Sequence, residues 1–197
     1  MAEDPRALAE EIRGCAVCAE RFAATATAHA PRPILRLSPT ARILIASQAP
    51  GARAHASGLP FDDPSGDRLR DWMAVDRATF YDDARIAIAP MGFCFPGYDA
   101  KGGDLPPPAC CAALWRARVL AAMPQIAFTL YVGGRALSWA LGRPVKVTET
   151  VRGWRGFGPG ALPLPHPSWR NTAWLKRNPW FEAEVVPALR AEVARRL

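Results

Sequence analysis

The residues best suited to chemistry stand in one loop about a third of the way along the chain. Asp62 and Asp63 are adjacent carboxylates, Phe61 precedes them, and the turn-forming sequence SQAPG occupies 47–51. The apolar run at 43–46 before that turn is typical of a short buried strand. Because ligands bind beyond the carboxyl ends of strands in an α/β sheet, this loop is predicted to form one wall of a pocket.

Five cysteines form a second group. Cys15 and Cys18 follow a predicted helix, an arrangement that can point two thiolates at one ion or cluster. Cys94 and Cys110 flank a later loop, and Cys111 is interpreted as a spare thiol because consecutive helical residues point about 100° apart. Four thiolates from the two pairs can hold zinc or a [4Fe–4S] cluster. Redox thiols and buried structural thiols are the alternatives.

Alternating strands and helices must position these residues. Apolar runs predict strands at 42–47, 85–90 and 126–132, an edge strand at 145–150 and an extended segment at 162–165. Helices are predicted at 4–13, 67–73, 76–81, 110–123 and 135–141, with a last one from 179 onward. The chain is therefore predicted to fold as one α/β domain over 1–197, a three-layer α/β/α structure with a mainly parallel central sheet.

Several local details are expectations of the same analysis. The segment 52–57 is expected to be flexible, and Ser65 is expected to cap the helix that follows. Leu114, Val119 and Met123 are candidate core residues. Asn178 is expected to cap the last helix, whose core face repeats every four residues at Phe181, Val185, Leu189 and Val193.

Length, charge and hydropathy limit the class of protein. The chain has 197 residues, 50% of them hydrophobic, and a formal net charge of +7. No apolar run reaches the roughly 18 residues of a membrane span, and the N-terminus is not a signal peptide, so a cytoplasmic location is expected. The positive charge suits a polyanion such as nucleic acid, and the alternative is that the arginine- and alanine-rich composition only reflects a GC-rich genome.

Three motifs in this order, together with the cysteines, resemble the uracil-DNA glycosylase superfamily, specifically its iron–sulfur branch (families 4 and 5). The first motif of that branch, G-E/L-A-P-G followed by G-x-P-F, corresponds here to SQAPG at 47–51 and GLPF at 58–61. The later H-P-S motif corresponds to 166–168. The branch also has a CxxC pair near its N-terminus and a second pair spaced like Cys94 and Cys110. The resemblance covers nearly the whole chain and implies a uracil-DNA glycosylase-like fold.

The resemblance implies roles in binding and releasing a base. Such enzymes take the target nucleotide out of the DNA stack. Phe61 would stack on the flipped base, and His166 would donate a hydrogen bond to the base oxygen that gains negative charge as the bond breaks. A core phenylalanine and a structural histidine are the alternatives. The rest of the base pocket would include Ala49, Pro50 and Gly51.

Other residues would hold the DNA. Ser168 in the H-P-S motif would bind a phosphate. Arg170 and Asn171 follow in the same loop and would add phosphate or groove contacts. Arg155, in a glycine-rich loop, is a further candidate for DNA contact, with a mobile surface loop as the alternative.

The catalytic carboxylate departs from the family pattern. Family 4 keeps a glutamate at the position of Gln48, whereas family 5 has an aspartate in D-A-S-G after the phenylalanine. Asp63 in DPSG matches the second pattern best, with one residue fewer after Phe61, and Asp62 is the reserve. A carboxylate there can stabilise the cationic sugar or orient water. The alternative is that both aspartates only begin a helix.

The base-reading position also departs from the pattern. Family 4 has an asparagine that reads the uracil edge, and the corresponding position here is Pro90, which cannot donate. Met91 and nearby backbone groups are the candidates to replace it. A shift toward other deaminated bases and a loss of glycosylase activity are both open.

The sequence thus predicts a monomeric DNA glycosylase that removes a deaminated base, first of all uracil, and carries a [4Fe–4S] cluster on Cys15, Cys18, Cys94 and Cys110. The cluster could be lost or replaced by zinc. The alternative function is a nucleic-acid-binding iron–sulfur protein of the same fold without hydrolysis. A metal protein unrelated to DNA is the third possibility.

Overall fold

Four short strands form a parallel sheet at the centre of the molecule. The computed structural model describes residues 3–197, so residues 1–2 of the predicted domain lie outside the described part. The strands are β1 (Ile43–Ala46), β2 (Ile86–Ile88), β3 (Phe128–Val132) and β4 (Ala161–Leu164), in the order β2-β1-β3-β4. All three pairings are parallel. The strands predicted at 42–47, 85–90 and 126–132 and the parallel sheet are confirmed.

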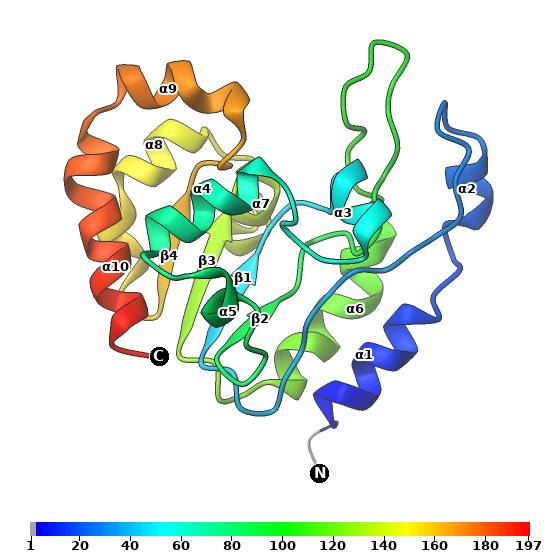
Figure 1. The fold of residues 1–197 in the computed structure, drawn as a ribbon, viewed down its shortest axis with the longest axis horizontal. Helices are drawn as coiled ribbons and strands as arrows, with labels where there is room; N and C mark the ends of the chain where they lie inside the picture. The colour runs from blue at the N-terminus through cyan, green and yellow to red at the C-terminus, as the bar shows by residue number, and fades with distance from the viewer. Residues whose placement is uncertain (1–2) are drawn as a thin grey trace.

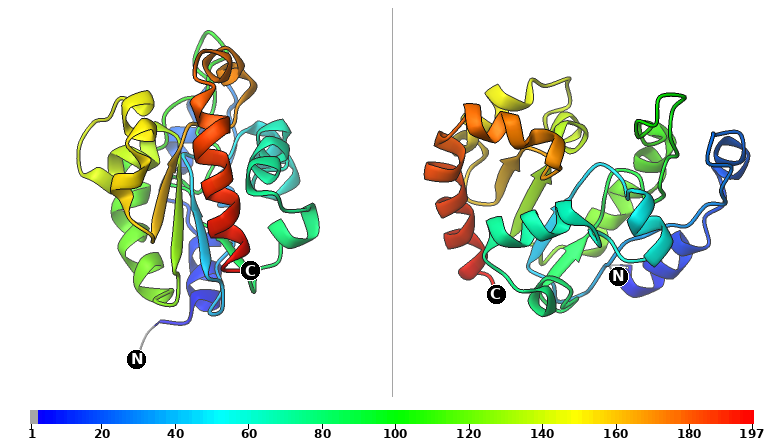
Figure 2. Two further views of the ribbon diagram at one scale, coloured as in Figure 1. Left: turned by 90° about the vertical axis from the view of Figure 1, so that its left-hand side faces the viewer. Right: turned by 45° about the horizontal axis from the view of Figure 1, so that its top comes forward.

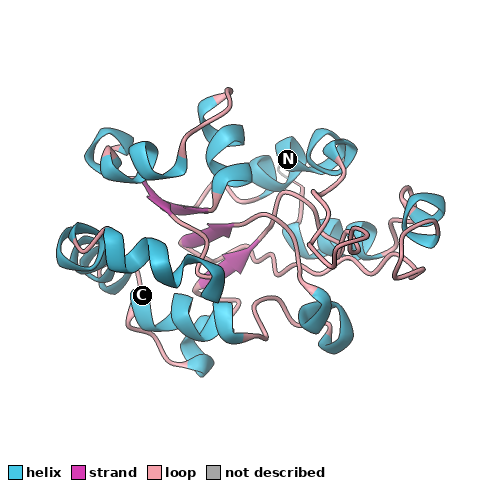
Figure 3. Cartoon of the chain, turned by 90° about the horizontal axis from the view of Figure 1, so that it is seen from above, coloured by secondary structure: helices cyan, strands magenta, loops and turns pink. Residues whose placement is uncertain are grey.

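Helices cover both faces of the sheet (Figures 1 and 2). On one face lie α4 (Pro64–Met73), α5 (Arg77–Phe80), the π-helical turn η3 (Phe181–Val185) and α10 (Val186–Ala194). On the other lie α1 (Pro5–Arg13), α6 (Ala109–Ala122) and α7 (Gly134–Leu141). The predicted three-layer α/β/α class is therefore confirmed, and Figure 3 shows the strands between the two helical layers.

The remaining elements are short. They are α2 (Ala19–Ala23), α3 (Ala52–Ser57), α8 (Val147–Arg152), η1 (Trp154–Phe157), η2 (Trp169–Asn171) and α9 (Thr172–Arg177). None of the helices in the described part of the chain has the length and apolar character needed to cross a membrane.

The strands divide their side chains between two cores. Ile43 and Ile45 of β1 face the layer of α4 and α10, whereas Leu44 between them faces α1 and α6. The four-residue repeat of the last helix is buried as predicted, at Phe181, Val185, Leu189 and Val193. Asn178 differs from its predicted capping role, because its Oδ1 accepts the indole N–H of Trp180 at 3.1 Å.

Two segments were assigned wrongly from sequence. Residues 145–150 do not form an edge strand, since 147–152 is the helix α8, which Val151 anchors in the core. The edge strand beside β3 is β4, where Pro163 is tolerated because an edge residue can do without its N–H. The segment 52–57 is the helix α3, which ends at Gly58 with a left-handed φ of 76°.

Two single residues also differ from expectation. The cap of α4 is Asp63 and not Ser65, because Pro64 takes the first helical position, where no N–H is needed. Leu114 is 49% exposed on the outer side of α6, whereas Val119 and Met123 are buried as expected.

Candidate active site

A cavity of about 370 Å³ opens at the carboxyl ends of the strands. The loops that follow β1, β2 and β4 supply its walls. From β1 the chain first crosses to β2 on one side of β1 and then to β3 on the other side. This is the topological switch point where open α/β sheets bind ligands. Figure 3 looks down on this end of the sheet. The structure brings together these sequence-predicted residues: Gln48, Ala49, Pro50, Gly51, Phe61, Asp63, His166, Ser168 and Arg170.

Asp63 both begins a helix and lines the cavity. Its Oδ1 accepts the N–H of Gly66 at 2.9 Å, so it caps α4 and lies at the positive end of that helix. Its Oδ2 faces Gly51, where an added Cβ would lie 3.9 Å away. The two interpretations of this residue, helix start and pocket carboxylate, are therefore compatible.

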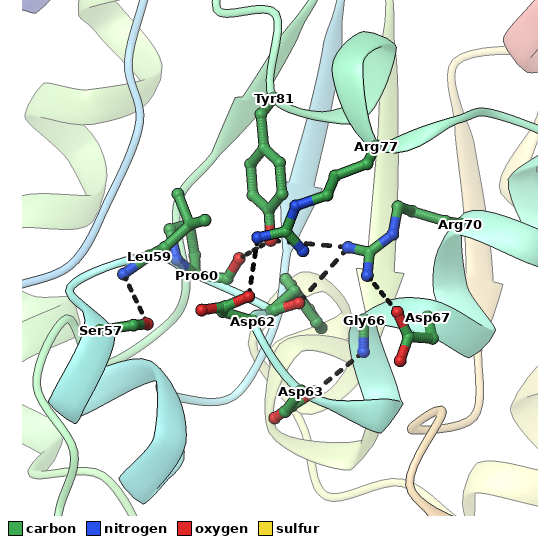
Figure 4. A network of polar contacts seen from close by, with 11 residues as sticks. Ser57, Leu59, Pro60, Asp62, Asp63, Gly66, Asp67, Arg70, Arg77 and Tyr81 are labelled. Carbon is green, nitrogen blue, oxygen red and sulfur yellow. Dashed lines mark hydrogen bonds and ion pairs between the residues drawn. The ribbon is translucent and has the colours of Figure 1, made fainter.

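Asp62 is directed elsewhere. It pairs with Arg77 at 2.8 Å, and it is absent from the cavity wall. The hydrogen bond from Arg77 lowers the pKa of Asp62, and a second one from Ser57 acts in the same direction. Figure 4 shows the two neighbouring aspartates pointing in different directions. Asp62 thus belongs to a surface ion pair.

Phe61 is held in an unusual backbone conformation. Its φ is +57°, a left-handed value that a bulky residue seldom adopts. Its carbonyl oxygen accepts a hydrogen bond from buried Arg70 at 3.4 Å, and a Cβ on Gly66 would come within 1.8 Å of that oxygen. The ring lines the cavity and meets Phe80 edge-on at 6.1 Å between centroids. Such strain is characteristic of functional sites, where surrounding contacts maintain it.

His166 presents one defined nitrogen to the cavity. Its Nδ1 accepts the N–H of Ser168 at 3.2 Å, so the neutral ring carries its proton on Nε2. Burial lowers the pKa of His166, and the negative charges of Asp63 and Asp104 oppose that effect only in part. A neutral imidazole whose Nε2–H has no partner can donate a hydrogen bond without carrying a positive charge.

Two further contacts fix the loop that carries His166. Asn171 Nδ2 donates to the carbonyl oxygen of His166 at 2.7 Å, so this predicted DNA contact supports the loop from within. Arg68 of α4 donates to the carbonyl oxygen of Ser168 at 2.9 Å and to Thr172 Oγ1 at 3.2 Å. These bonds join two segments a hundred residues apart in sequence.

Among the charged and aromatic residues of the cavity wall, sequence analysis missed four. Arg53, Tyr98, Asp104 and Trp169 all line it. Arg53 follows the SQAPG turn in the segment predicted to be flexible, and Trp169 directly follows the H-P-S motif, so the position of both next to a motif is a signal that could have found them. Tyr98 and Asp104 come from a glycine- and proline-rich loop with no periodicity that would place them.

Two other predicted residues lie apart from the cavity. Met91 is buried against Ala46 and Ala136, and it packs between sheet and α7. Arg155 lies over the ring of Trp154 at 4.4 Å and pairs with Glu184 at 3.2 Å. Neither belongs to the cavity wall. Ile88 and Pro90, just before Met91 in the chain, line the cavity in place of Met91.

The cysteines gather on the α6 side without forming a complete metal site. Cys18 and Cys110 approach to 3.8 Å between sulfurs, and Phe93 N–H donates to Cys111 Sγ at 3.4 Å. Burial raises the pKa of Cys94 to about 12 and that of Cys111 to about 11, and neighbouring thiols act in the same direction. Among residues 3–197, no three histidine, cysteine or acidic side chains are placed to hold a metal ion. The donor set fits a thiophilic group by type, and the ligand assignment stays a prediction.

The fold and the cavity agree with the comparison to known families. The chain matches the model of the uracil DNA glycosylase superfamily over residues 36–190. This match covers most of the chain and includes every element that lines the cavity. The protein belongs to the uracil DNA glycosylase superfamily. Cys15 and Cys18 lie before the matched residues, so the match does not bear on the iron–sulfur branch.

Proposed function

We propose that the protein is a DNA glycosylase that hydrolyses the N-glycosidic bond of a deaminated base, first of all uracil. The observation that carries the proposal is that Phe61, Asp63 and His166 line one cavity at the carboxyl edge of the sheet. A cavity of about 370 Å³ is of a size that takes small organic ligands. Its walls supply an aromatic ring, a carboxylate and a neutral imidazole, and these groups suit a flipped base and the charges of its departure.

The proposed chemistry assigns one task to each group. Phe61 stacks on the flipped base, and the Nε2–H of His166 donates to the base oxygen that becomes negative. Asp63, held at the N-terminus of α4 by its bond to Gly66, stabilises the positive sugar through its charge. Arg53 and Arg170 on the cavity wall are suited to the flanking phosphates, together with the hydroxyl of Ser168.

The base panel that tests this function must be broad. Gln48 stands where family 4 has glutamate, and Pro90 contributes no donor to the cavity wall. Oligonucleotides that contain uracil, hypoxanthine or xanthine are incubated with the protein and then treated with alkali, which cleaves abasic sites. We expect strand scission with at least one base, and first with uracil. Intact strands with all three would reject the glycosylase function.

The second candidate function is nucleic-acid binding without hydrolysis. Gln48 and Pro90 favour it, because both replace groups on which family 4 relies. A gel shift at low salt distinguishes the cases: binding without scission supports this candidate, and scission rejects it. Absence of both would indicate a protein unrelated to DNA, since phosphate contacts are strongest at low salt.

We also propose that Cys15, Cys18, Cys94 and Cys110 hold a [4Fe–4S] cluster with a structural role, with zinc as the competing ion. The contact between Cys18 and Cys110 supports a shared ligand set. The bound group would tie the N-terminal turn to the loop between β2 and α6. Iron and zinc analysis of the purified protein, with an absorbance scan near 400 nm, tests this (roughly where thiolate-bound iron absorbs). A metal-free protein whose four cysteines all react with a thiol reagent would contradict it.

The remaining expectations are part of the same proposal. The protein is taken to act on DNA as a monomer in the cytoplasm. Size-exclusion chromatography with light scattering, with and without a short duplex, measures the number of protein chains per complex. A dimer in both conditions would contradict the monomer.

A further inference from the structure

The cavity holds a second carboxylate that no motif predicts. Asp104 lines the same cavity as Asp63 and His166, although it comes from the loop between β2 and α6. The two aspartates act on His166 together, since both negative charges favour its protonated form. Asp104 therefore lies close enough for its charge to act on the imidazole ring that is proposed to donate a hydrogen bond to the leaving base.

The loop fixes where Asp104 stands. Its backbone pairs with Tyr98 in an antiparallel bridge, and Leu105 N–H donates to the carbonyl oxygen of Gly97 at 2.9 Å. At the tip, Asp99 Oδ1 accepts the N–H groups of Lys101 at 2.8 Å and Gly103 at 2.9 Å. The loop is thus a closed hairpin that presents Asp104 at a defined place.

The hydrogen-bond partners of the two carboxylates differ. Asp63 has one oxygen committed to the N–H of Gly66. The Asp104 carboxylate has no hydrogen-bond or ion-pair partner within residues 3–197, and the residue is exposed at the cavity. An ionised carboxylate only accepts hydrogen bonds, so both of its oxygens remain available to a water or another donor.

A free carboxylate is an unfavourable choice for a surface that binds DNA. Like charges brought together at an interface weaken binding, and Asp104 shares the cavity wall with Arg53 and Arg170, which are suited to phosphates. A position that weakens binding needs a compensating gain at another step. Acceptance of a proton in the chemical step is such a gain.

We propose that Asp104 is the general base of the hydrolysis, while Asp63 stabilises the sugar cation. This inference rests on the proposed glycosylase function. The water oxygen forms a bond to C1′ of the sugar, and the bond between C1′ and the base nitrogen breaks. The electron pair of that bond leaves with the base, which His166 stabilises by hydrogen bonding. The proton of the attacking water passes to Asp104.

Single-turnover cleavage of the base found active in the panel tests the assignment. The variants are Asp104→Asn and, as a control with the same charge change, Asp71→Asn, an exposed residue of α4 outside the cavity wall. We expect D104N to cleave about 10²–10⁴ times more slowly, the usual contribution of a general base. D71N should match the wild type. D104N should bind the uncleaved duplex at least as tightly as the wild type, because a negative charge has been removed.

The pH profile separates the two carboxylates. A general base must be ionised, so the wild-type rate constant should fall toward acid pH, and this fall should be absent from the residual activity of D104N. D63N should be slower but retain the acid fall. Loss of the acid fall in D63N with its retention in D104N would reverse the roles and overturn the inference.

Two outcomes distinguish this inference from the function on which it rests. If the wild type is active and D104N cleaves equally fast, the role of Asp104 is overturned but the glycosylase function is not. A wild type inactive on every base would overturn both. The placement of Asp104 near His166 can be checked separately, because D104N should lower the pKa of His166 measured in an NMR titration. Asp104→Glu, which keeps the carboxylate, should recover part of the lost rate.

Discussion

At the scale of single residues, the orientation of His166 limits what the site can do. The N–H of Ser168 occupies Nδ1, which leaves Nε2–H toward the cavity. Gly133, with a φ of +84°, runs beside the ring, and a Cβ there would lie 3.4 Å from it. Burial holds the pKa of His166 below its ordinary value, so the ring acts as a neutral donor near pH 7.

The first prediction removes this donor. His166→Ala should lower the single-turnover rate constant about 10²–10³-fold, the effect of losing one donor to a developing anion. Base-release assays at saturating protein measure it. His166→Gln, whose amide can still donate, should fall less. Equal losses in both variants would contradict a role through hydrogen-bond donation.

The second prediction concerns the contact of Gly66 with the strained Phe61. Gly66→Ala would place a methyl group on the Phe61 carbonyl oxygen, at 1.8 Å, so the loop must move. We expect the free energy of unfolding to fall by about 1–3 kcal/mol, as for an overpacked site. Thermal or urea unfolding measures it. Gly156→Ala, with no atom within 4 Å of the added group, is the matched control and should be near neutral.

At the scale of elements, α4 joins the two halves of the site. Asp63 begins this helix, and Arg68 within it donates to Ser168 and Thr172 from the late loop. A change at the start of α4 therefore affects stability as well as chemistry. The two effects can be separated by the choice of substituent.

The third prediction uses that separation. Asp63→Ser keeps a good capping group but removes the charge, whereas Asp63→Ala removes both. We expect D63A to lose about 0.5–2 kcal/mol of unfolding free energy and D63S much less. Both should lose cleavage rate to a similar degree. A D63S variant with full activity would show that capping was the only contribution of this residue.

The same elements show how far sequence reasoning reaches. The strands at 43–46, 86–88 and 128–132 were predictable because an apolar run between turn residues has few other interpretations. The helix at 147–152 was not, since its alternating Val and Thr pattern also suits a strand. The motif residues Phe61, Asp63 and His166 were found by order along the chain. Asp104 was not, because only the closed hairpin brings it to the cavity.

At the scale of the whole molecule, the proposed encounter with DNA depends on charge. The chain has a net charge of +7, and Arg53 and Arg170 of the cavity wall have no carboxylate partner within residues 3–197. Arg170 lies 5.9 Å from the ring of Trp169, which is 70% exposed. These groups are free to meet phosphates.

The fourth prediction follows from those cations. The logarithm of DNA affinity should fall linearly with the logarithm of salt concentration. Arg53→Gln and Arg170→Gln should each reduce the slope by about 1. Fluorescence anisotropy with a labelled duplex at several salt concentrations measures it. Arg143→Gln, a control outside the cavity wall, should leave the slope unchanged.

The fifth prediction concerns acid. Burial lowers the pKa of both His55 and His166, and nearby His29 and Arg32 act further on His55. Below the ordinary histidine pKa of about 6.5, the unfolded chain binds more protons than the folded one. Stability is therefore full above that pH and is lost as pH falls through the lowered folded values. Unfolding midpoints between pH 7.5 and 5, roughly the window set by these shifts, should decline, and His55→Leu should weaken the decline. A constant midpoint in the wild type would contradict it.

The hairpin between Gly97 and Leu105 has a consequence for engineering. Its two ends already meet through the Leu105 N–H and the Gly97 carbonyl, so a replacement segment would begin and end at two neighbouring points. The tip of the hairpin can be exchanged as a cassette, of different length or composition, provided that Asp104 and its bridge to Tyr98 are kept. Grafting loops from relatives at this junction would be a direct route to new base preferences on an unchanged framework.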